Sequence, residues 1–270
     1  MTSRTLVIEG LRLRLFHRKA GRLGIVLIHG NSSCKEVFAR QLKELSRSDL
    51  GIVVPDLPGH GGSDNSDRPG KTYSFPGYAR TLTKLMRRLG YASYHVVGWS
   101  LGGHVGIEML ASDPAVRSLL ITGTPPVRLT PAGAAEGFRW TGATALAGRW
   151  RLSREDVRRY TNAMMGERLS EDHHLWSMVR RTDGRARYWM VANAMAGRGA
   201  DEVDTVSRSD RPVAIVQGDA DPFLRLDYLE RIPFKNLWKS QPLLIRAGHA
   251  AHWQAPQAFN AAMMDFLTTH

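Results

Sequence analysis

The chain has 270 residues, of which 43% are hydrophobic and 23% are charged, and these proportions are those of an ordinary soluble globular protein. Its 37 Lys and Arg residues outnumber its 25 Asp and Glu residues, which gives a formal net charge of +12. The basic residues are scattered and no nucleic-acid-binding motif accompanies them, so we expect a basic surface and no nucleic-acid partner.

The cysteine count and the apolar runs narrow the class further. A single cysteine, Cys34, excludes an internal disulfide framework and a cysteine-based zinc site. No stretch approaches the ~20 apolar residues of a membrane span, and Met1–Phe16 has no apolar run fit for a signal peptide. We therefore expect no membrane insertion and a cytoplasmic location. The sequence does not indicate an oligomeric state.

Apolar and polar residues alternate at Thr5–Glu9 and at Leu11–Phe16, on either side of Gly10, which predicts a β-hairpin. The apolar runs that follow are short and continuous, as is typical of strands buried on both faces of a parallel sheet. They are Ile25–Ile28, Ile52–Val54, His95–Val97, Leu119–Ile121, Val213–Val216 and Leu243–Ile245. Helical patterns lie between them, for example at Tyr78–Leu89, Gly103–Ala111 and Pro256–Leu267. This alternation predicts an α/β fold with a mostly parallel eight-stranded sheet flanked by helices.

The alternation breaks once, between about Val127 and Arg208, where we expect helices and loops but no strand. We interpret residues 128–207 as a helical cap, inserted into a core domain formed by residues 1–127 and 208–270. Trp and Met residues are frequent in the predicted cap, and such side chains can line an adaptable apolar cavity. Met164 is our candidate for that lining.

The segment Gly98-Trp99-Ser100-Leu101-Gly102-Gly103 has the pattern G-x-S-x-G-G. It follows a predicted strand and opens a predicted helix, which is the context of a nucleophile elbow. Glycine residues flank the serine because the sharp turn from strand to helix leaves no room for side chains beside it. Ser100 is therefore the candidate nucleophile. Trp99 either forms a wall of the substrate pocket or packs in the core beneath the elbow.

A serine nucleophile needs a general base, and the base needs a carboxylate that orients it. Asp219 and Asp221 both follow the strand predicted at Val213–Val216, and we prefer Asp221 because Asp219 suits a local turn. His249 stands first after the last predicted strand, and it is the candidate base. His252 is the rival, but three residues further on it suits packing against the closing helix.

The negative charge that develops on an attacked carbonyl oxygen needs hydrogen-bond donors. The backbone N–H of Leu101, directly after the nucleophile, is one candidate. A second should come from the loop after Ile25–Ile28, where residues 29–33 read His-Gly-Asn-Ser-Ser. We expect the N–H of Asn31 to serve, with that of Ser32 as the alternative.

These motifs resemble those of the α/β-hydrolase superfamily, and the resemblance covers nearly the whole chain. Besides the elbow, it rests on His29-Gly30-Asn31, Asp56-Leu57-Pro58-Gly59-His60-Gly61, Gly218–Asp221 and Gly248-His249. A narrower similarity, to N-acyl-homoserine lactonases of the AidH type, rests on His29–Ser33, Gly98–Glu108, Ile121–Val127, Arg181–Arg187 and Asn236-Leu237-Trp238. Those are metal-independent quorum-quenching enzymes that open the lactone ring of bacterial acyl-homoserine signals.

The resemblance implies an α/β-hydrolase fold with a cap, no cofactor, and roles for Ser100, His249 and Asn31. It also implies a role for a cap tyrosine that matches Tyr160, whose phenol could donate a hydrogen bond to the bound ester. Where the family has a glutamate as the third member of its triad, this chain has Asp221. The shorter carboxylate can serve the same orienting role.

Together, the residues and the resemblance predict a serine hydrolase that opens N-acyl-homoserine lactones, with a small acyl lactone or ester as its partner. His173 and His174 form an isolated pair, without the other ligands that zinc-dependent lactonases need, so we predict no metal. One alternative is a general carboxylesterase that acts on short acyl esters. Another is a ligand receptor of the same fold that turns over slowly.

Overall fold

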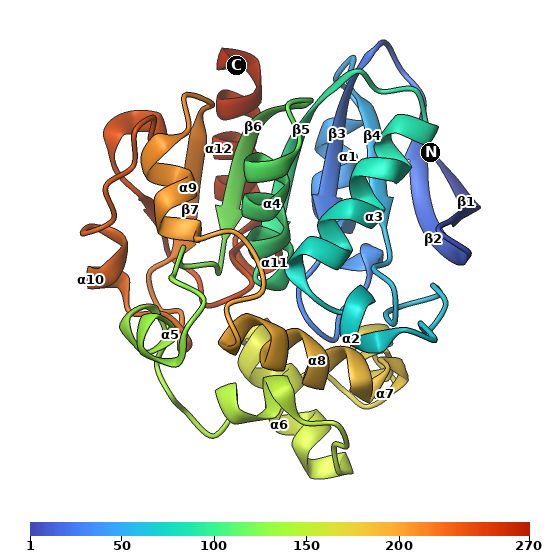
Figure 1. Cartoon of the computed structure of the whole chain (residues 1–270), viewed down its shortest axis with the longest axis vertical. Coiled ribbons are helices and arrows are strands. Elements are labelled where there is room, and N and C mark those ends of the chain that lie inside the picture. The colour runs from blue at the N-terminus through green and yellow to red at the C-terminus, as the bar shows by residue number, and fades with distance from the viewer.

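An eight-stranded sheet runs through the centre of the computed structural model, which describes residues 1–270 (Figure 1). Its order is β1-β2-β4-β3-β5-β6-β7-β8. β2 pairs antiparallel with β1 and with β4, and all other neighbours are parallel. The predicted mostly parallel eight-stranded sheet is thus confirmed. The strands are β1 (Thr2–Ile8), β2 (Leu11–Arg18), β3 (Leu23–Ile28), β4 (Gly51–Pro55), β5 (Ser93–Trp99), β6 (Val116–Thr122), β7 (Val213–Gly218) and β8 (Leu243–Ile245).

The apolar runs form strands because they fill both faces of the sheet. Every residue of β4 and of β7 is buried, and in β5 Val96 and Val97 belong to two different hydrophobic clusters, as the alternation of side chains requires. The first hairpin turns at Glu9 and Gly10, with φ of 51° and 81°. Two successive positive φ angles are those of a type I′ turn, whose twist matches that of the paired strands.

Helices cover both faces of this sheet. In Figure 1, α3 and α4 lie in front of the sheet, and α1 and α12 lie behind it. The helices outside the predicted cap are α1 (Ala39–Leu45), α2 (Pro69–Thr72), α3 (Phe75–Arg88), α4 (Leu101–Ser112), α10 (Leu226–Leu229), α11 (Ala251–Gln254) and α12 (Pro256–Thr269). Short 3₁₀ helices occupy Lys35–Phe38, Thr144–Gly148 and Trp238–Ser240. None of the helices combines the length and the apolar character needed to cross a membrane.

Between β6 and β7 the chain forms helices and no strand, as expected. They are α5 (Pro131–Gly137), α6 (Arg154–Met165), α7 (His174–Arg181), α8 (Gly184–Met195) and α9 (Glu202–Arg208). α6, α7 and α8 lie beyond the lower end of the sheet in Figure 1, where the arrow of β6 ends, whereas α9 packs beside α4 on the front face. Most of the inserted segment therefore covers the carboxyl ends of the parallel strands, where open α/β sheets bind their ligands.

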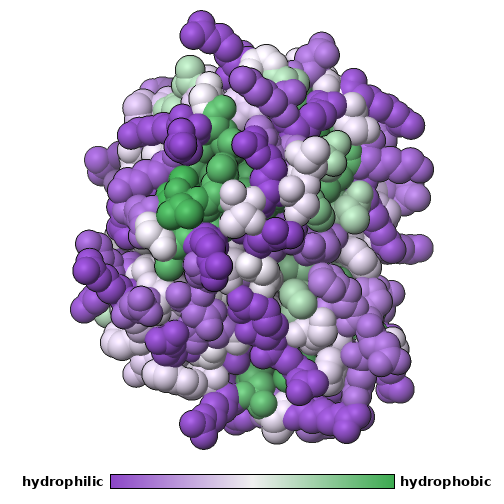
Figure 2. All heavy atoms as spheres, turned by 90° about the vertical axis from the view of Figure 1, so that its right-hand side faces the viewer, coloured by the Kyte–Doolittle hydropathy of each residue, from purple (hydrophilic) through white to green (hydrophobic).

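The outer surface is largely polar. Figure 2 shows hydrophilic side chains over most of one face, with the apolar side chains gathered mainly in its upper part. Three of the large apolar side chains that are exposed belong to the segment between β6 and β7, namely Trp140, Trp150 and Tyr188. The exposed aromatic surface is thus concentrated over the carboxyl edge of the sheet.

A buried ion pair joins two loops at this edge. Asp56, directly after β4, is fully buried and accepts hydrogen bonds from the backbone N–H of Lys35 at 2.7 Å and from its Nζ at 2.9 Å. It also accepts the N–H of Gly62 at 2.8 Å. Lys35 is the first residue of the 3₁₀ helix that follows β3, and the loop between them carries Asn31. Because a buried carboxylate must keep its partners, Asp56 holds this loop in one position.

Asp56→Ala should lower the free energy of unfolding by about 3–5 kcal/mol, because two backbone N–H groups and the Lys35 ammonium lose a buried acceptor. Glu36 still pairs with that ammonium, but it cannot replace the bonds to the two amides. Urea unfolding followed by circular dichroism measures the change. The matched control is Glu44→Ala, which removes an exposed ion pair with Arg47 and should cost less than about 1 kcal/mol. Equal losses in the two variants would contradict the role given to the buried pair.

Candidate active site

Ser100 occupies a sharp turn between β5 and α4, with φ 54° and ψ −119°. A residue with a side chain adopts such a backbone only where the surrounding structure imposes it. The turn requires Gly102, because a Cβ there would lie 1.9 Å from the carbonyl oxygen of Ile28. The N–H of Ser100 donates to the carbonyl of Thr122 at 2.9 Å. The local geometry is that of a nucleophile elbow.

His249 and Asp221 form a buried hydrogen-bonded pair in the loops after β8 and β7. Nδ1 of His249 lies 2.9 Å from Oδ2 of Asp221, and the two side chains are 4% and 0% exposed. Because an ionised carboxylate only accepts hydrogen bonds, Nδ1 carries the proton of a neutral ring and Nε2 is left as the acceptor. This is the tautomer that a general base beside a serine requires.

The surroundings of Asp221 keep it ionised. Its Oδ2 also accepts from Nε2 of Gln217 at 2.9 Å, and its Oδ1 accepts from the N–H of Phe223 at 2.8 Å. Burial is the largest single influence and would raise the pKa of Asp221, but His249 and the other two donors together outweigh it. The pKa of Asp221 is therefore lowered below its usual value.

The rival residues are engaged elsewhere. Asp219 is exposed, and its Oδ1 accepts the N–H of Ala247 at 3.2 Å, as expected of a turn residue. His252 is fully buried against Trp99, with ring centroids 4.9 Å apart, and neither of its ring nitrogens has a partner. Burial lowers the pKa of His252 to about 3, so its ring stays neutral. These placements favour Asp221 and His249 over their rivals.

Several contacts bring Ser100 and His249 to the same edge of the sheet. Nε1 of Trp99 donates to the carbonyl of His249 at 3.0 Å, and a Cβ on Gly123 would lie 2.9 Å from Cε1 of the same imidazole. Gly123 follows Thr122, whose carbonyl binds the N–H of Ser100. The hydroxyl of Ser100 makes no hydrogen bond to His249 in this structure. Catalytic bonds of this kind often tighten only when substrate binds.

Two backbone N–H groups beside Ser100 are free to bind an anionic oxygen. That of Leu101 is the first of α4, where helix geometry leaves donors without partners. Neither this group nor the N–H of Asn31 donates to an acceptor in the protein. Asn31 lines the same cavity as Ser100, whereas Ser32 does not. The side chain of Asn31 donates to the carbonyl of Ala147 at 2.9 Å, so its loop is tied to the inserted segment.

The cavity at Ser100 has a volume of about 220 Å³. Of its 19 lining residues, 14 are hydrophobic, which suits an acyl chain. Its apolar walls include Val127, Leu129, Met190, Ala194 and Met195. Tyr160 of α6 also lines it, and burial raises the pKa of this phenol. Tyr160 therefore remains a hydrogen-bond donor over the whole ordinary pH range.

The structure decides between the two positions considered for Trp99 and corrects the one predicted for Met164. Trp99 does not line the cavity, because alternate residues of β5 point to one face and Trp99 shares a core cluster with Val97. It is the core residue beneath the elbow. Met164 is also buried in that cluster and outside the lining. It lies one turn beyond Tyr160, where α6 has passed the cavity and ends against Gln254 of α11, whose Nε2 donates to the carbonyl of Met165 at 2.8 Å.

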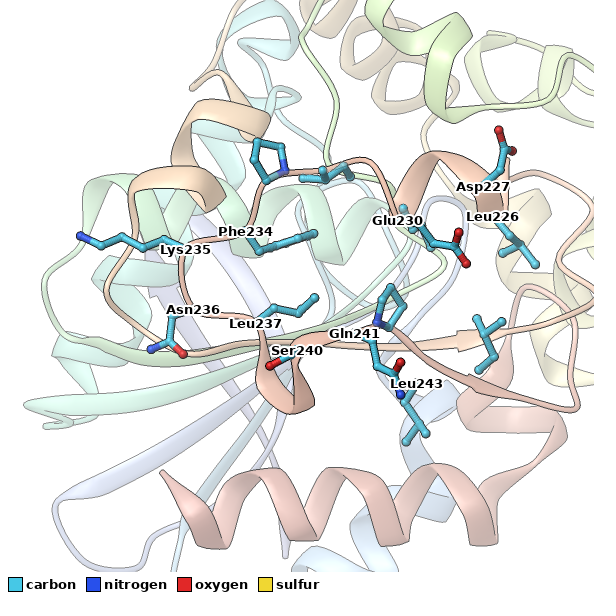
Figure 3. Close-up of a pocket in the computed structure, with 15 residues that line it drawn as sticks. Leu226, Asp227, Glu230, Phe234, Lys235, Asn236, Leu237, Ser240, Gln241 and Leu243 are labelled. Atoms are coloured by element: carbon cyan, nitrogen blue, oxygen red, sulfur yellow. The ribbon is translucent and has the colours of Figure 1, made fainter.

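A larger groove, of about 1090 Å³, lies beside β8 (Figure 3). Its 15 lining residues fall between Leu226 and Leu244. It is lined by charged residues such as Asp227, Glu230 and Lys235, but it contains no histidine and none of the candidate catalytic residues. The smaller cavity is lined by Ser100, Leu101 and Asn31, while His249 and Asp221 lie outside its lining. The smaller cavity is therefore the candidate active site.

One cluster outside that cavity has the ligand types that transition metals prefer. Ligand atoms of Cys34, Glu36 and His174 lie within 4.8 Å of one another. Glu36 also pairs with Nζ of Lys35 at 2.7 Å. Spacing along the chain does not reveal the cluster, because 140 positions separate Cys34 from His174. None of the three lines the cavity at Ser100, and metal-independent chemistry there stays a prediction.

Sequence reasoning missed Gln217, which links two loops of the site. Its Oε1 accepts the N–H of Gly123 at 2.9 Å, while its Nε2 donates to Asp221. The sequence did contain a signal for a buried polar contact, because Gln217 is a polar residue in the otherwise apolar run Val213–Gly218. A polar side chain buried in a strand must find partners, and here those partners are a backbone N–H and the carboxylate of the site.

The fold and the elbow define the class of protein. A model described as the alpha/beta hydrolase family matches residues 25–262. The chain belongs to this family. Its eight-stranded, mostly parallel sheet with flanking helices is that of the α/β-hydrolase fold.

Among solved structures, the chain is similar to the N-acyl homoserine lactonase AidH, at 38% identity and a TM-score of 0.93. One is a mutant complexed with N-hexanoyl homoserine lactone, with 99% of this chain and 97% of that chain covered. Another is AidH complexed with N-butanoyl homoserine, with 99% and 96% covered. A curated 2-hydroxy-6-oxononadienedioate/2-hydroxy-6-oxononatrienedioate hydrolase of Paraburkholderia phymatum is 26% identical over 278 residues, which cover 97% of this chain and 93% of that protein. These relatives support hydrolase activity.

The lowered pKa of Asp221 predicts how stability depends on pH. Its ionised form stabilises the fold at pH values above the usual Asp pKa of about 3.9, and this contribution is lost as the pH falls through the lower pKa of the folded protein. Asp221→Asn should therefore be less stable than the wild type by about 1–3 kcal/mol at pH 7, and the difference should shrink below about pH 4. Urea unfolding of both proteins between pH 7 and pH 3 measures it. A difference that is constant over this range would contradict the assignment.

Proposed function

We propose that this protein is a serine hydrolase that opens the lactone ring of N-acyl-homoserine lactones. The observation that carries the proposal is the meeting of the strained Ser100 and the buried His249–Asp221 pair at one edge of the sheet, with a small apolar cavity at Ser100. The similarity to AidH, solved with a hexanoyl homoserine lactone and with a butanoyl homoserine, supports this class of substrate.

In the first step, Oγ of Ser100 attacks the lactone carbonyl, and Nε2 of His249 takes the proton of the Ser100 hydroxyl. The free N–H groups of Leu101 and Asn31 stabilise the oxyanion that forms. Asp221 holds the imidazole in the required tautomer and stabilises its protonated form. The attack produces an acyl-serine, and the ring oxygen leaves as an alkoxide.

A lactone makes the second step unusual, because its leaving group stays attached to the acyl part. The alkoxide would close the ring again unless it is protonated quickly. Protonated His249 supplies that proton, and the phenol of Tyr160 donates a hydrogen bond at the same place. His249 then activates a water molecule, which releases the opened acyl-homoserine from Ser100.

The size of the cavity bears on the length of the acyl chain. Its volume of about 220 Å³ lies below the ~300–1,000 Å³ of sites for drug-sized ligands. Short acyl chains such as butanoyl and hexanoyl suit this volume best. Longer chains would require the inserted segment to move.

Ser100→Ala should reduce kcat for N-hexanoyl-homoserine lactone by at least about a thousandfold, since the nucleophile is lost. Release of acid in a pH-indicator assay measures the rate. The control is Ser177→Ala, which removes an exposed serine of α7 and should leave kcat within about twofold.

Two results would contradict the proposal. If p-nitrophenyl esters of short acids are cleaved far faster than any acyl-homoserine lactone, the protein is a carboxylesterase. If neither substrate is turned over while a lactone still binds, it is a receptor. Rapid quenching followed by mass spectrometry separates the covalent route, which leaves an acyl group on Ser100, from direct attack by water, which leaves none.

A further inference from the structure

A second histidine–carboxylate pair lines the cavity. His104 lies on α4 four residues after Ser100, and its backbone N–H donates to the carbonyl of Ser100 at 3.3 Å, so the two residues are one turn of backbone apart. Its ring forms part of the cavity wall. Nδ1 of His104 lies 2.7 Å from Oε1 of Glu202 on α9. Both side chains are nearly sealed from solvent, at 9% and 2% exposure. The catalytic steps proposed above do not use this pair.

The ring of His104 is fixed on three sides. Phe75 stacks on it, with the ring centroids 5.0 Å apart and the ring planes inclined by 4°. The ring of Phe138 also lies against it, with the two centroids 5.9 Å apart. Glu202 is itself held in place, since its Oε2 accepts the N–H of Val127 at 2.9 Å. Because the carboxylate only accepts hydrogen bonds, Nδ1 donates to it, and Nε2 of the neutral ring is left as an acceptor for a ligand. No group of the protein hydrogen-bonds to it.

The other polar side chains of the cavity wall are already accounted for. Asn31 donates to Ala147, and Thr144 donates to the carbonyl of Thr141 at 2.8 Å. Ser100 and Tyr160 belong to the proposed catalytic machinery. Apart from the indole of Trp140, whose side chain is exposed, Nε2 of His104 is the remaining unpaired polar side-chain atom of the wall that would hold the acyl chain.

We propose that Nε2 of His104 accepts a hydrogen bond from a hydroxyl group on C3 of the acyl chain, and that the enzyme prefers 3-hydroxy acyl-homoserine lactones to 3-oxo and unsubstituted ones. The inference rests on the proposed lactonase function. An unsubstituted or 3-oxo chain would cover Nε2 without offering it a donor, and an unmade buried hydrogen bond is costly. C3 lies further from the lactone carbonyl than the amide does, and His104 lies one turn further along the chain than the nucleophile, on the wall of the same cavity.

The test compares kcat/KM for N-(3-oxohexanoyl)-, N-(3-hydroxyhexanoyl)- and N-hexanoyl-homoserine lactone. In the wild type, kcat/KM for the 3-hydroxyhexanoyl substrate should exceed that for the 3-oxohexanoyl and hexanoyl substrates by roughly tenfold, which corresponds to one ordinary hydrogen bond. His104→Leu should bring that ratio close to one. All three substrates carry the amide, so a hydrogen bond between His104 and the amide would affect them equally. The ratio of their kcat/KM values would then be the same in the wild type and in His104→Leu, and this result would overturn the inference.

Two Glu→Gln substitutions serve as a matched pair of variants. Glu202→Gln removes the carboxylate that holds His104 while preserving its shape, and it should also reduce the ratio; it decides the question if His104→Leu does not fold. Glu108→Gln makes the same change on α4, at a carboxylate that accepts the N–H of Ala200 at 2.8 Å and does not line the cavity. The ratio should be unchanged in this control.

The two proposals fail in different ways. If the wild type hydrolyses p-nitrophenyl esters and opens no lactone, the proposed function fails and the preference fails with it. If all three lactones are opened at similar kcat/KM, or if His104→Leu and Glu202→Gln keep the wild-type ratio, only the inference about His104 is overturned.

Discussion

The close contact between the start of α4 and the end of β3 is the constraint on which the candidate site depends. Gly102 lies so near the carbonyl of Ile28 that no side chain fits between them. The contact forces the backbone at Ser100 into its left-handed turn and places the loop that carries Asn31 beside it. A larger residue at position 102 would separate the nucleophile from one of the two amides expected to stabilise the oxyanion.

Much of the fold was predictable because its physical cause is local. Strands buried on both faces need continuous apolar runs, and the runs in this chain stand at the observed strands. Asp221 and His249 were predictable for a related reason. Parallel strands end at the same edge of the sheet, so polar residues that directly follow β7 and β8 are brought together, and the structure joins them by a hydrogen bond.

The features that were missed depend on packing between distant segments. Trp99 was an ambiguous residue until the direction of β5 was known, and Met164 was assigned to the pocket although α6 carries it past the cavity. The pair formed by His104 and Glu202 joins residues 98 positions apart, and no pattern in the sequence connects them. Only the docking of α9 on α4 makes Glu202 the partner of a histidine beside the nucleophile.

The central claim is that His249, held by Asp221, activates Ser100. The most direct test is the rate at which a fluorophosphonate labels the protein, with the modified residue identified by peptide mass spectrometry. The account predicts one label per molecule, on Ser100, and labelling slower by roughly a thousandfold in His249→Gln. Labelling of another residue, or an equal rate in the two proteins, would contradict it.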